Sequence, residues 1–200
     1  MVLTVAVGFA GTGLLAHHLL TRNDADDRGA VPARFDETPP TQALRDQLLR
    51  SSWAELGIRP RPSGVWGVLM ELGFAKGVAT VVGLADGTAS LYLTSGGGVL
   101  GAGARESVRR AAMALCDAAA SALAKASPAA TVPGASPAHP YPQPAAGHVR
   151  FYLLTVAGLR VADGEEAKLR GGKDPLSPLY DSGQGVITAL REASGGAAAR

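Results

Sequence analysis

The chain has 200 residues, 46% of them hydrophobic and 18% charged, which is enough to bury one ordinary core. Lys and Arg number 19 against 17 Asp and Glu, and only 5% of residues are aromatic. This composition argues against nucleic-acid binding, which needs clustered cations and stacking rings. The single cysteine, Cys116, excludes an internal disulfide framework. The abundance of Ala, Gly and Pro is typical of high-GC bacterial coding.

The first 20 residues form an apolar stretch. No residue with a formal charge precedes Arg22, so the stretch up to Leu20 has about the length that a helix needs to cross a bilayer. Arg28 and Arg34 follow it, and this one-sided distribution of basic residues favours a body that faces the cytoplasm. We therefore expect residues 1–20 to be a single-pass membrane anchor at the inner membrane; otherwise the protein is expected to be cytoplasmic.

Two other structures are open for the same residues. Residues 3–7, followed by Gly8, Gly11 and Gly13, resemble the strand and glycine turn that begin a dinucleotide-binding fold. A second strand ending in an acidic residue should come next, but residues 21–40 are polar and carry prolines, as a linker does. The third alternative is a buried or frayed terminal element.

A single α+β domain is expected over residues 41–195. Thr41 can cap a first helix, in which Leu44, Leu48 and Leu56 keep helical spacing and after which Gly57 follows.

The first strand of the domain is expected at residues 65–74. Its alternating apolar residues share one face, and Glu71 lies on the opposite face, where an acidic residue is usually solvated.

Residues 78–95 carry the clearest turn of the chain. Residues 78–84 are apolar and β-branched, residues 88–95 alternate between apolar and polar, and Asp86-Gly87 between them suits a tight turn with positive φ. The pattern predicts an antiparallel hairpin.

Residues 104–126 change to a helical period, with a face rich in alanine that would let the helix approach a sheet closely. Cys116 neighbours this face and is expected to be an inert buried thiol. The Pro/Ala-rich residues 127–147 carry no formal charge and are expected to form a flexible or partly polyproline insertion. His139 and His148 at this insertion make a poor metal site.

The last part of the domain is expected to contain strands and a helix. Residues 148–156 predict a strand, and Asp163-Gly164 predicts a short hairpin between residues 159–162 and 165–169. A final helix is expected at residues 183–193, capped by Asp181 or Ser182. Together these elements predict a central antiparallel sheet of about five strands with helices packed on it.

The best local candidate for a ligand site is the glycine-rich loop at residues 95–106. Backbone N–H groups at its glycines, the start of a helix and one guanidinium would suit a phosphate, a nucleotide or a carboxylate. The residues concerned are Gly96, Gly97, Gly98, Gly101, Gly103 and Arg105. The alternative, which we favour, is that these glycines bend a strand end or admit the helix closely.

The order of elements, and above all the hairpin VVGLADGTASLYL followed by a long helix, is similar to that of roadblock-type domains and, more loosely, of longin and profilin-like domains. The resemblance implies a small, non-catalytic module that binds protein partners or self-associates. Nucleophile–base pairs, metal-ligand clusters and a complete nucleotide fingerprint are all lacking, so we expect no catalytic residue, no cofactor and no metal. The alternative is an anionic-ligand binding domain or an enzyme that uses residues 95–106.

Overall fold

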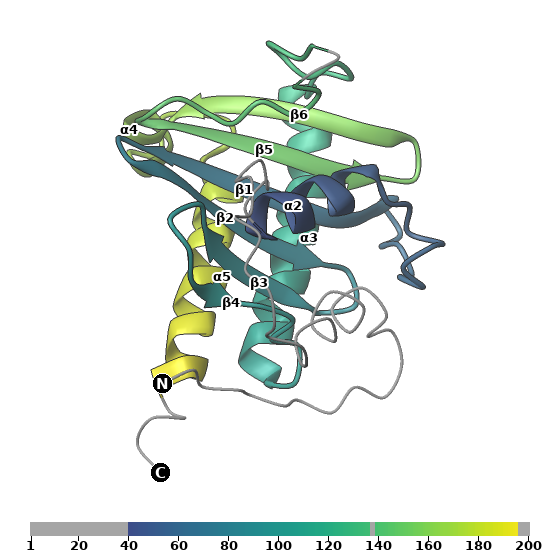
Figure 1. Cartoon of the computed structure of the whole chain (residues 1–200). Helices are drawn as coiled ribbons and strands as arrows, with labels where there is room; N and C mark the ends of the chain where they lie inside the picture. Colours follow the sequence, from purple (N-terminus) through teal and green to yellow (C-terminus); the bar gives the residue numbers. More distant parts are fainter. Residues whose placement is uncertain (1–39, 137–138, 196–200) are drawn as a thin grey trace, which may run out of the picture. The chain divides into compact units, whose positions relative to one another are not determined.

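A six-stranded antiparallel sheet forms the centre of the fold (Figure 1). The structure is a computed structural model that describes residues 40–136 and 139–195. The strand order is β4-β3-β2-β1-β5-β6. The strands are β1 (Val65–Phe74), β2 (Gly77–Leu84), β3 (Ala89–Leu93), β4 (Gly98–Val99), β5 (His148–Thr155) and β6 (Gly158–Glu165). The predicted α+β class with an antiparallel sheet is confirmed, with one strand more than the five expected.

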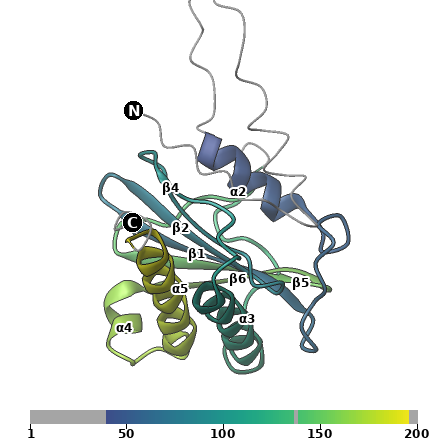
Figure 2. The same cartoon turned by 90° about the horizontal axis from the view of Figure 1, so that it is seen from below.

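The helices cover both faces of this sheet. Figure 2 shows α3 (Glu106–Ala126) and α5 (Ser177–Gly195) side by side on one face, and α2 (Pro40–Arg50) on the other. The short helix α4 (Glu166–Arg170) follows β6. No helix among the described residues is long and apolar enough to span a membrane. The expected anchor at residues 1–20 and residues 21–39 of the expected linker lie outside the described part. The last residue of that linker, Pro40, is instead the first residue of α2, so Thr41 lies inside the helix and does not precede it as a cap.

The hairpin predicted at Asp86-Gly87 is confirmed. β2 and β3 pair antiparallel from Ala79 opposite Leu93 to Gly83 opposite Ala89. The Asp86 carboxylate accepts a hydrogen bond from the Thr88 N–H at 2.8 Å, and Gly87 has a φ of +90°. The turn therefore uses the two chemical properties for which these residue types are selected, a short side-chain acceptor and a left-handed backbone.

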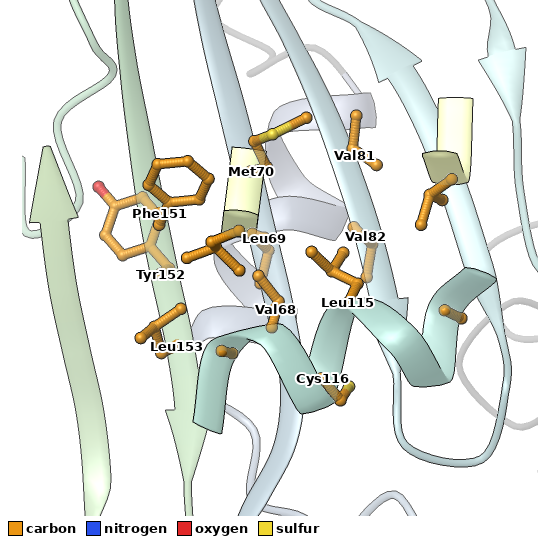
Figure 3. Close-up of a cluster of buried hydrophobic side chains, with 14 of the residues drawn as sticks. Val68, Leu69, Met70, Val81, Val82, Leu115, Cys116, Phe151, Tyr152 and Leu153 are labelled. Carbon is orange, nitrogen blue, oxygen red and sulfur yellow. The ribbon is translucent and has the colours of Figure 1, made fainter. Parts of the chain in front are cut away.

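Helix α3 packs closely on the sheet because small residues from both elements meet at the contact. A side chain at Gly83 of β2 would lie 3.3 Å from the Cα of Ala112 and 3.0 Å from Leu115. Figure 3 shows Leu115 and Cys116 of α3 facing the strands, next to Val68. All of these side chains are buried, as the alanine-rich pattern predicts.

The predicted hairpin at Asp163-Gly164 is wrong. β6 continues through both residues and stays paired with β5, with Asp163 opposite Arg150 and Gly164 opposite Val149. The chain then enters α4 instead of a strand, and Leu169 of α4 packs on the space that Gly164 leaves open. Tertiary pairing therefore overrides a turn signal that is strong in isolation.

The final helix begins earlier than predicted, at Ser177. The Leu176 N–H donates to the Asp174 carboxylate at 2.8 Å, and the Asp174 N–H donates to the Ser177 hydroxyl at 3.3 Å, so these two residues cap the helix instead of Asp181 or Ser182. Gly183 lies inside the helix, at a position where any side chain would collide with Met70 of β1. The glycine that suggested a helix start is thus a point of close packing.

The first helix ends at Arg50, six residues before Leu56, where the prediction placed its end. Ser52 and Glu55 exchange hydrogen bonds in a separate turn, in which the Ser52 N–H donates to the Glu55 carboxylate at 2.7 Å. Gly57 closes this turn with a φ of +66°. Local side-chain bonds thus interrupt the helical spacing that continues to Leu56.

Candidate functional site

The glycine-rich loop is a hairpin and its exit. The Leu93 N–H donates to the Gly97 carbonyl at 3.2 Å, and the Gly96 N–H donates to the Leu93 carbonyl at 3.0 Å. Gly96 and Gly97 have φ values of +94° and +83°, in the region that L side chains rarely adopt. These two glycines therefore make the turn between β3 and β4.

The remaining glycines are explained by contacts with β3 and its preceding turn. A side chain at Gly98 would collide with the backbone of Leu91 and Tyr92. The Gly101 N–H donates to the Ser90 hydroxyl at 3.0 Å, and a side-chain carbon added at Gly103 would lie 3.4 Å from the Cα of Thr88.

Arg105 lies at the start of α3, with its side chain exposed and without a side-chain hydrogen bond that caps the helix. The structure thus brings the six predicted residues into one segment, in which several of the N–H groups already have acceptors. Anion binding there stays a prediction.

Replacing Gly98 by Ala tests the structural role of the loop. We expect Gly98→Ala to lower the free energy of unfolding by about 1–3 kcal/mol, because the strained φ of +143° and the collision with β3 both oppose it. Gly97→Ala is the matched control, since its φ is also positive but nothing lies within 4 Å of the added carbon. Urea unfolding measures both variants, and equal losses would contradict the proposed close contact.

A second candidate site is the buried ion pair between Arg45 of α2 and Glu71 of β1. The two residues are 1% and 0% exposed. The guanidinium donates from Nε to Oε1 and from Nη2 to Oε2, the latter at 2.9 Å, so the pair is bidentate. A third donor, Nη1, reaches the carboxylate of Asp46 at 2.8 Å.

Polar side chains from the neighbouring strands complete this site. The Thr80 hydroxyl of β2 donates to Glu71 at 3.4 Å, and the Tyr152 hydroxyl of β5 accepts from Arg45 at 3.3 Å. The guanidinium carbon also lies 5.4 Å from the centre of the Tyr152 ring, a cation–π distance. Arg45 is therefore held by a carboxylate, a hydroxyl and an aromatic face.

The polar side chains form a row across five strands. Glu71 lies opposite Thr80 on β2 and opposite Arg150 on β5, Thr80 lies opposite Tyr92 on β3, and Arg150 lies opposite Asp163 on β6. Directly opposite residues point to the same face of a sheet, so the whole row faces α2. We call these five residues the polar row.

Residues of the proline-rich insertion close one end of the polar row. The Pro142 carbonyl accepts hydrogen bonds from Arg150 at 2.8 Å and from the Tyr152 hydroxyl at 2.9 Å. Arg150 also makes a bidentate pair with Asp163, at 2.6 and 2.8 Å. The part of the insertion around Pro142 is thus fixed to the sheet, instead of being the flexible excursion that its composition predicts.

Burial is the largest influence on the pKa values of Glu71 and Tyr92 in the polar row and of the neighbouring Tyr152 and Arg45. It raises the pKa of the Glu71 carboxyl, against the opposing effect of Arg45, and it raises the pKa of the Tyr152 and Tyr92 hydroxyls. For Arg45, burial alone would lower the pKa, but the hydrogen bonds and charge of Glu71 outweigh it and the pKa is raised. The Glu71 carboxylate therefore favours the charged form of the guanidinium that it binds.

The expectation that Glu71 is solvated is wrong. Both faces of β1 are covered, so the alternation that places Glu71 opposite Met70 places it under α2 and not in water. The sequence did contain one indication that Glu71 is buried: residues 65–74 are apolar almost throughout, which is typical of a strand covered on both faces. Its partner Arg45 was missed because it lies beside the leucines that appeared to define the helix face.

The other expected features are located as follows. Cys116 is buried as predicted, and burial raises the pKa of its thiol to about 12, which keeps it protonated and unreactive. Within residues 40–136 and 139–195, no group of three or more His, Cys, Asp or Glu side chains could hold a metal ion. Every buried side-chain nitrogen and oxygen of the described residues has a hydrogen-bond partner.

The fold and the buried site define an α+β protein with a six-stranded antiparallel sheet, covered by helices on both faces. No protein-family model matches the chain, and the search found no matching curated protein and no matching solved structure.

Proposed function

We propose that the protein is a non-catalytic interaction or regulatory module, which binds a protein partner or a second copy of itself through the outer edge of β4. The observation that supports this function is the difference between the two edges of the sheet. The proposal includes a membrane tether at residues 1–20.

The β4 edge has the properties of a pairing surface. Because Leu93 bonds to Gly97, alternation along the strand directs the backbone groups of Gly98 and Leu100 away from β3. No residue from 87 to 104 is charged, and Leu100 is 49% exposed. An uncharged edge with unpaired backbone groups is a template for an added strand.

The opposite edge, on β6, is closed. Val161 exchanges two backbone hydrogen bonds of 2.8 Å with Ala129, which occupies the middle of the strand. Asp163 and Glu165 add charges to the same strand. Bridging and charge are two ways in which proteins protect an edge from unwanted pairing, and among residues 40–136 and 139–195 neither protects β4.

The buried ionic groups support a structural over a catalytic role. Arg45 pairs with Glu71 and Arg150 with Asp163, so the charges on this face of the sheet neutralise each other.

A charge placed on the β4 edge tests this function. We expect wild-type protein to self-associate or to retain a partner, and Leu100→Lys to weaken that association by about tenfold or more, because a lysine on an edge strand opposes pairing. Val156→Lys is the matched control, since Val156 is 55% exposed in the turn between β5 and β6.

Sedimentation velocity over a range of concentrations measures self-association, and binding to a candidate partner is measured with the same three proteins. A wild-type chain that stays monomeric and binds no partner would contradict the proposal, as would a Leu100→Lys variant that associates like the wild type.

A further inference from the structure

The two faces of the sheet are built differently. On the face under α3 and α5, the central strands present apolar residues such as Val68, Met70 and Phe151. On the face under α2, the same strands carry the polar row. The surface beneath α3 and α5 is apolar, whereas the surface beneath α2 combines polar groups that water can solvate with buried apolar side chains such as Leu69 and Val82.

Helix α2 is attached to the sheet through few buried side chains, and Arg45 is the polar one among them. Only Arg45 and Leu49 are buried on it among residues 41–50, while Leu44 and Leu48 are half-buried. The contact that holds the centre of the helix is therefore the Arg45 guanidinium, which extends to Glu71.

Apart from the Asp46 carboxylate of α2 itself, the groups that receive the guanidinium belong to the sheet. Glu71 supplies a bidentate carboxylate, Thr80 bonds to that carboxylate, and Tyr152 supplies a hydroxyl and a ring face. The Pro142 carbonyl holds the Tyr152 hydroxyl in place independently of α2. Planar, bidentate recognition with an aromatic face is the chemistry that selects arginine over lysine.

We propose that the face of the sheet around Glu71, Thr80 and Tyr152 is a guanidinium-binding surface, that α2 is a displaceable strap over it, and that an arginine-bearing helix of a partner protein takes the place of α2. The sequence of α2 serves as the model for this partner. We expect the partner segment to be an amphipathic helix in which an arginine and a leucine are four residues apart and share one face, as Arg45 and Leu49 do. This surface is separate from the β4 edge, so either proposal can fail without the other.

The first test uses the full-length chain with Arg45→Ala, which empties the surface, and a fluorescein-labelled peptide of residues 40–50, PTQALRDQLLR. Two control peptides carry R45L and R50L, because Arg50 is exposed while Arg45 is buried. We expect anisotropy titrations to show that the R50L peptide binds the variant about tenfold or more tightly than the R45L peptide does. We also expect the unmodified peptide to bind the variant about tenfold more tightly than the wild type, in which α2 competes. Equal binding of the two control peptides, or binding of neither, would overturn the proposal.

A second measurement applies if Arg45→Ala does not fold. In wild-type full-length protein, we expect hydrogen exchange at the α2 amides to be about a hundredfold faster than at the α3 and α5 amides, because a strap opens without global unfolding. Millimolar ethylguanidinium should accelerate exchange in α2 alone, while ethylammonium at the same ionic strength should not. Exchange of α2 at the same rate as α3 and α5, or no difference between the two cations, would overturn the displaceable strap.

Discussion

Replacing Arg45 by Met is expected to lower the free energy of unfolding by about 3–5 kcal/mol, the usual cost of leaving one buried charge without its partner. The loss arises at Glu71, which is 0% exposed and would keep only the Thr80 hydroxyl as a hydrogen-bond partner. Urea is the suitable denaturant, because guanidinium would compete for the same carboxylate.

The double variant Arg45→Met/Glu71→Leu is the control. Two apolar side chains of similar volume remove both charges at once, and such replacements of a buried pair are often neutral or stabilising. We expect the double variant to recover most of the loss. If it is as unstable as the single variant, the instability comes from lost packing and not from the unpaired charge.

The stability of Arg45→Met is also expected to depend on pH in a defined direction. Burial raises the pKa of Glu71 above the ordinary value of 4.5, and the opposing effects of Arg45 are lost in the variant. The folded variant then binds a proton that the unfolded chain releases, so its free energy of unfolding falls as the pH rises from 4.5 through the raised pKa. Urea unfolding at pH 5 and pH 8 should show a smaller deficit relative to the wild type at about pH 5. A deficit that does not change with pH would contradict an ionised, unpaired Glu71.

Truncating Leu115 in the core is expected to have an effect of similar size. Leu115→Ala removes a fully buried side chain where α3 meets β2, and we expect a loss of about 2–5 kcal/mol in the free energy of unfolding. The range is wide because the cost depends on how far α3 can move to fill the cavity. Since Ala112 already lies close to Gly83, little further approach is open to the helix, and the upper part of the range is expected.

Leu100→Ala removes the same atoms from a side chain that is 49% exposed and serves as the control. We expect it to change the free energy of unfolding by no more than about 0.5 kcal/mol. Thermal or urea unfolding of the two variants measures how much of the lost stability comes from burial of the leucine, since the same atoms are removed at both positions. Similar losses at the two positions would contradict the assigned core.

The sequence predicted those elements whose signals are local. β1 is found at Val65–Phe74 as expected, because a proline-rich stretch breaks the chain before it and its residues are strand-forming throughout. The Asp86-Gly87 hairpin and the long alanine-rich helix α3 are also determined by residues within one element. In each of these cases the burial pattern and the backbone preference agree.

The candidate site was not predictable in the same way, because it depends on strand register. Nothing near Glu71 in the sequence indicates that Arg150 lies opposite it, since β5 follows β1 only after α3 and the proline-rich insertion. In the sequence alone, Arg45 looks like any polar residue of a helix, and only the structure shows that it pairs with Glu71. β4 was missed for a different reason: a strand of two residues leaves no periodicity to detect.

The pairing of β1 with β5 has a consequence for how the chain folds during synthesis. Strands β1 to β4 follow one another directly and can pair as soon as they leave the ribosome. The second edge of β1, however, is completed only by residues 149–155, so loop closure across α3 and the insertion must come first. Until then β1, which is buried along nearly its whole length in the folded domain, has one edge open. The nascent chain is therefore most prone to aggregation after α3 has emerged and before β5 is available.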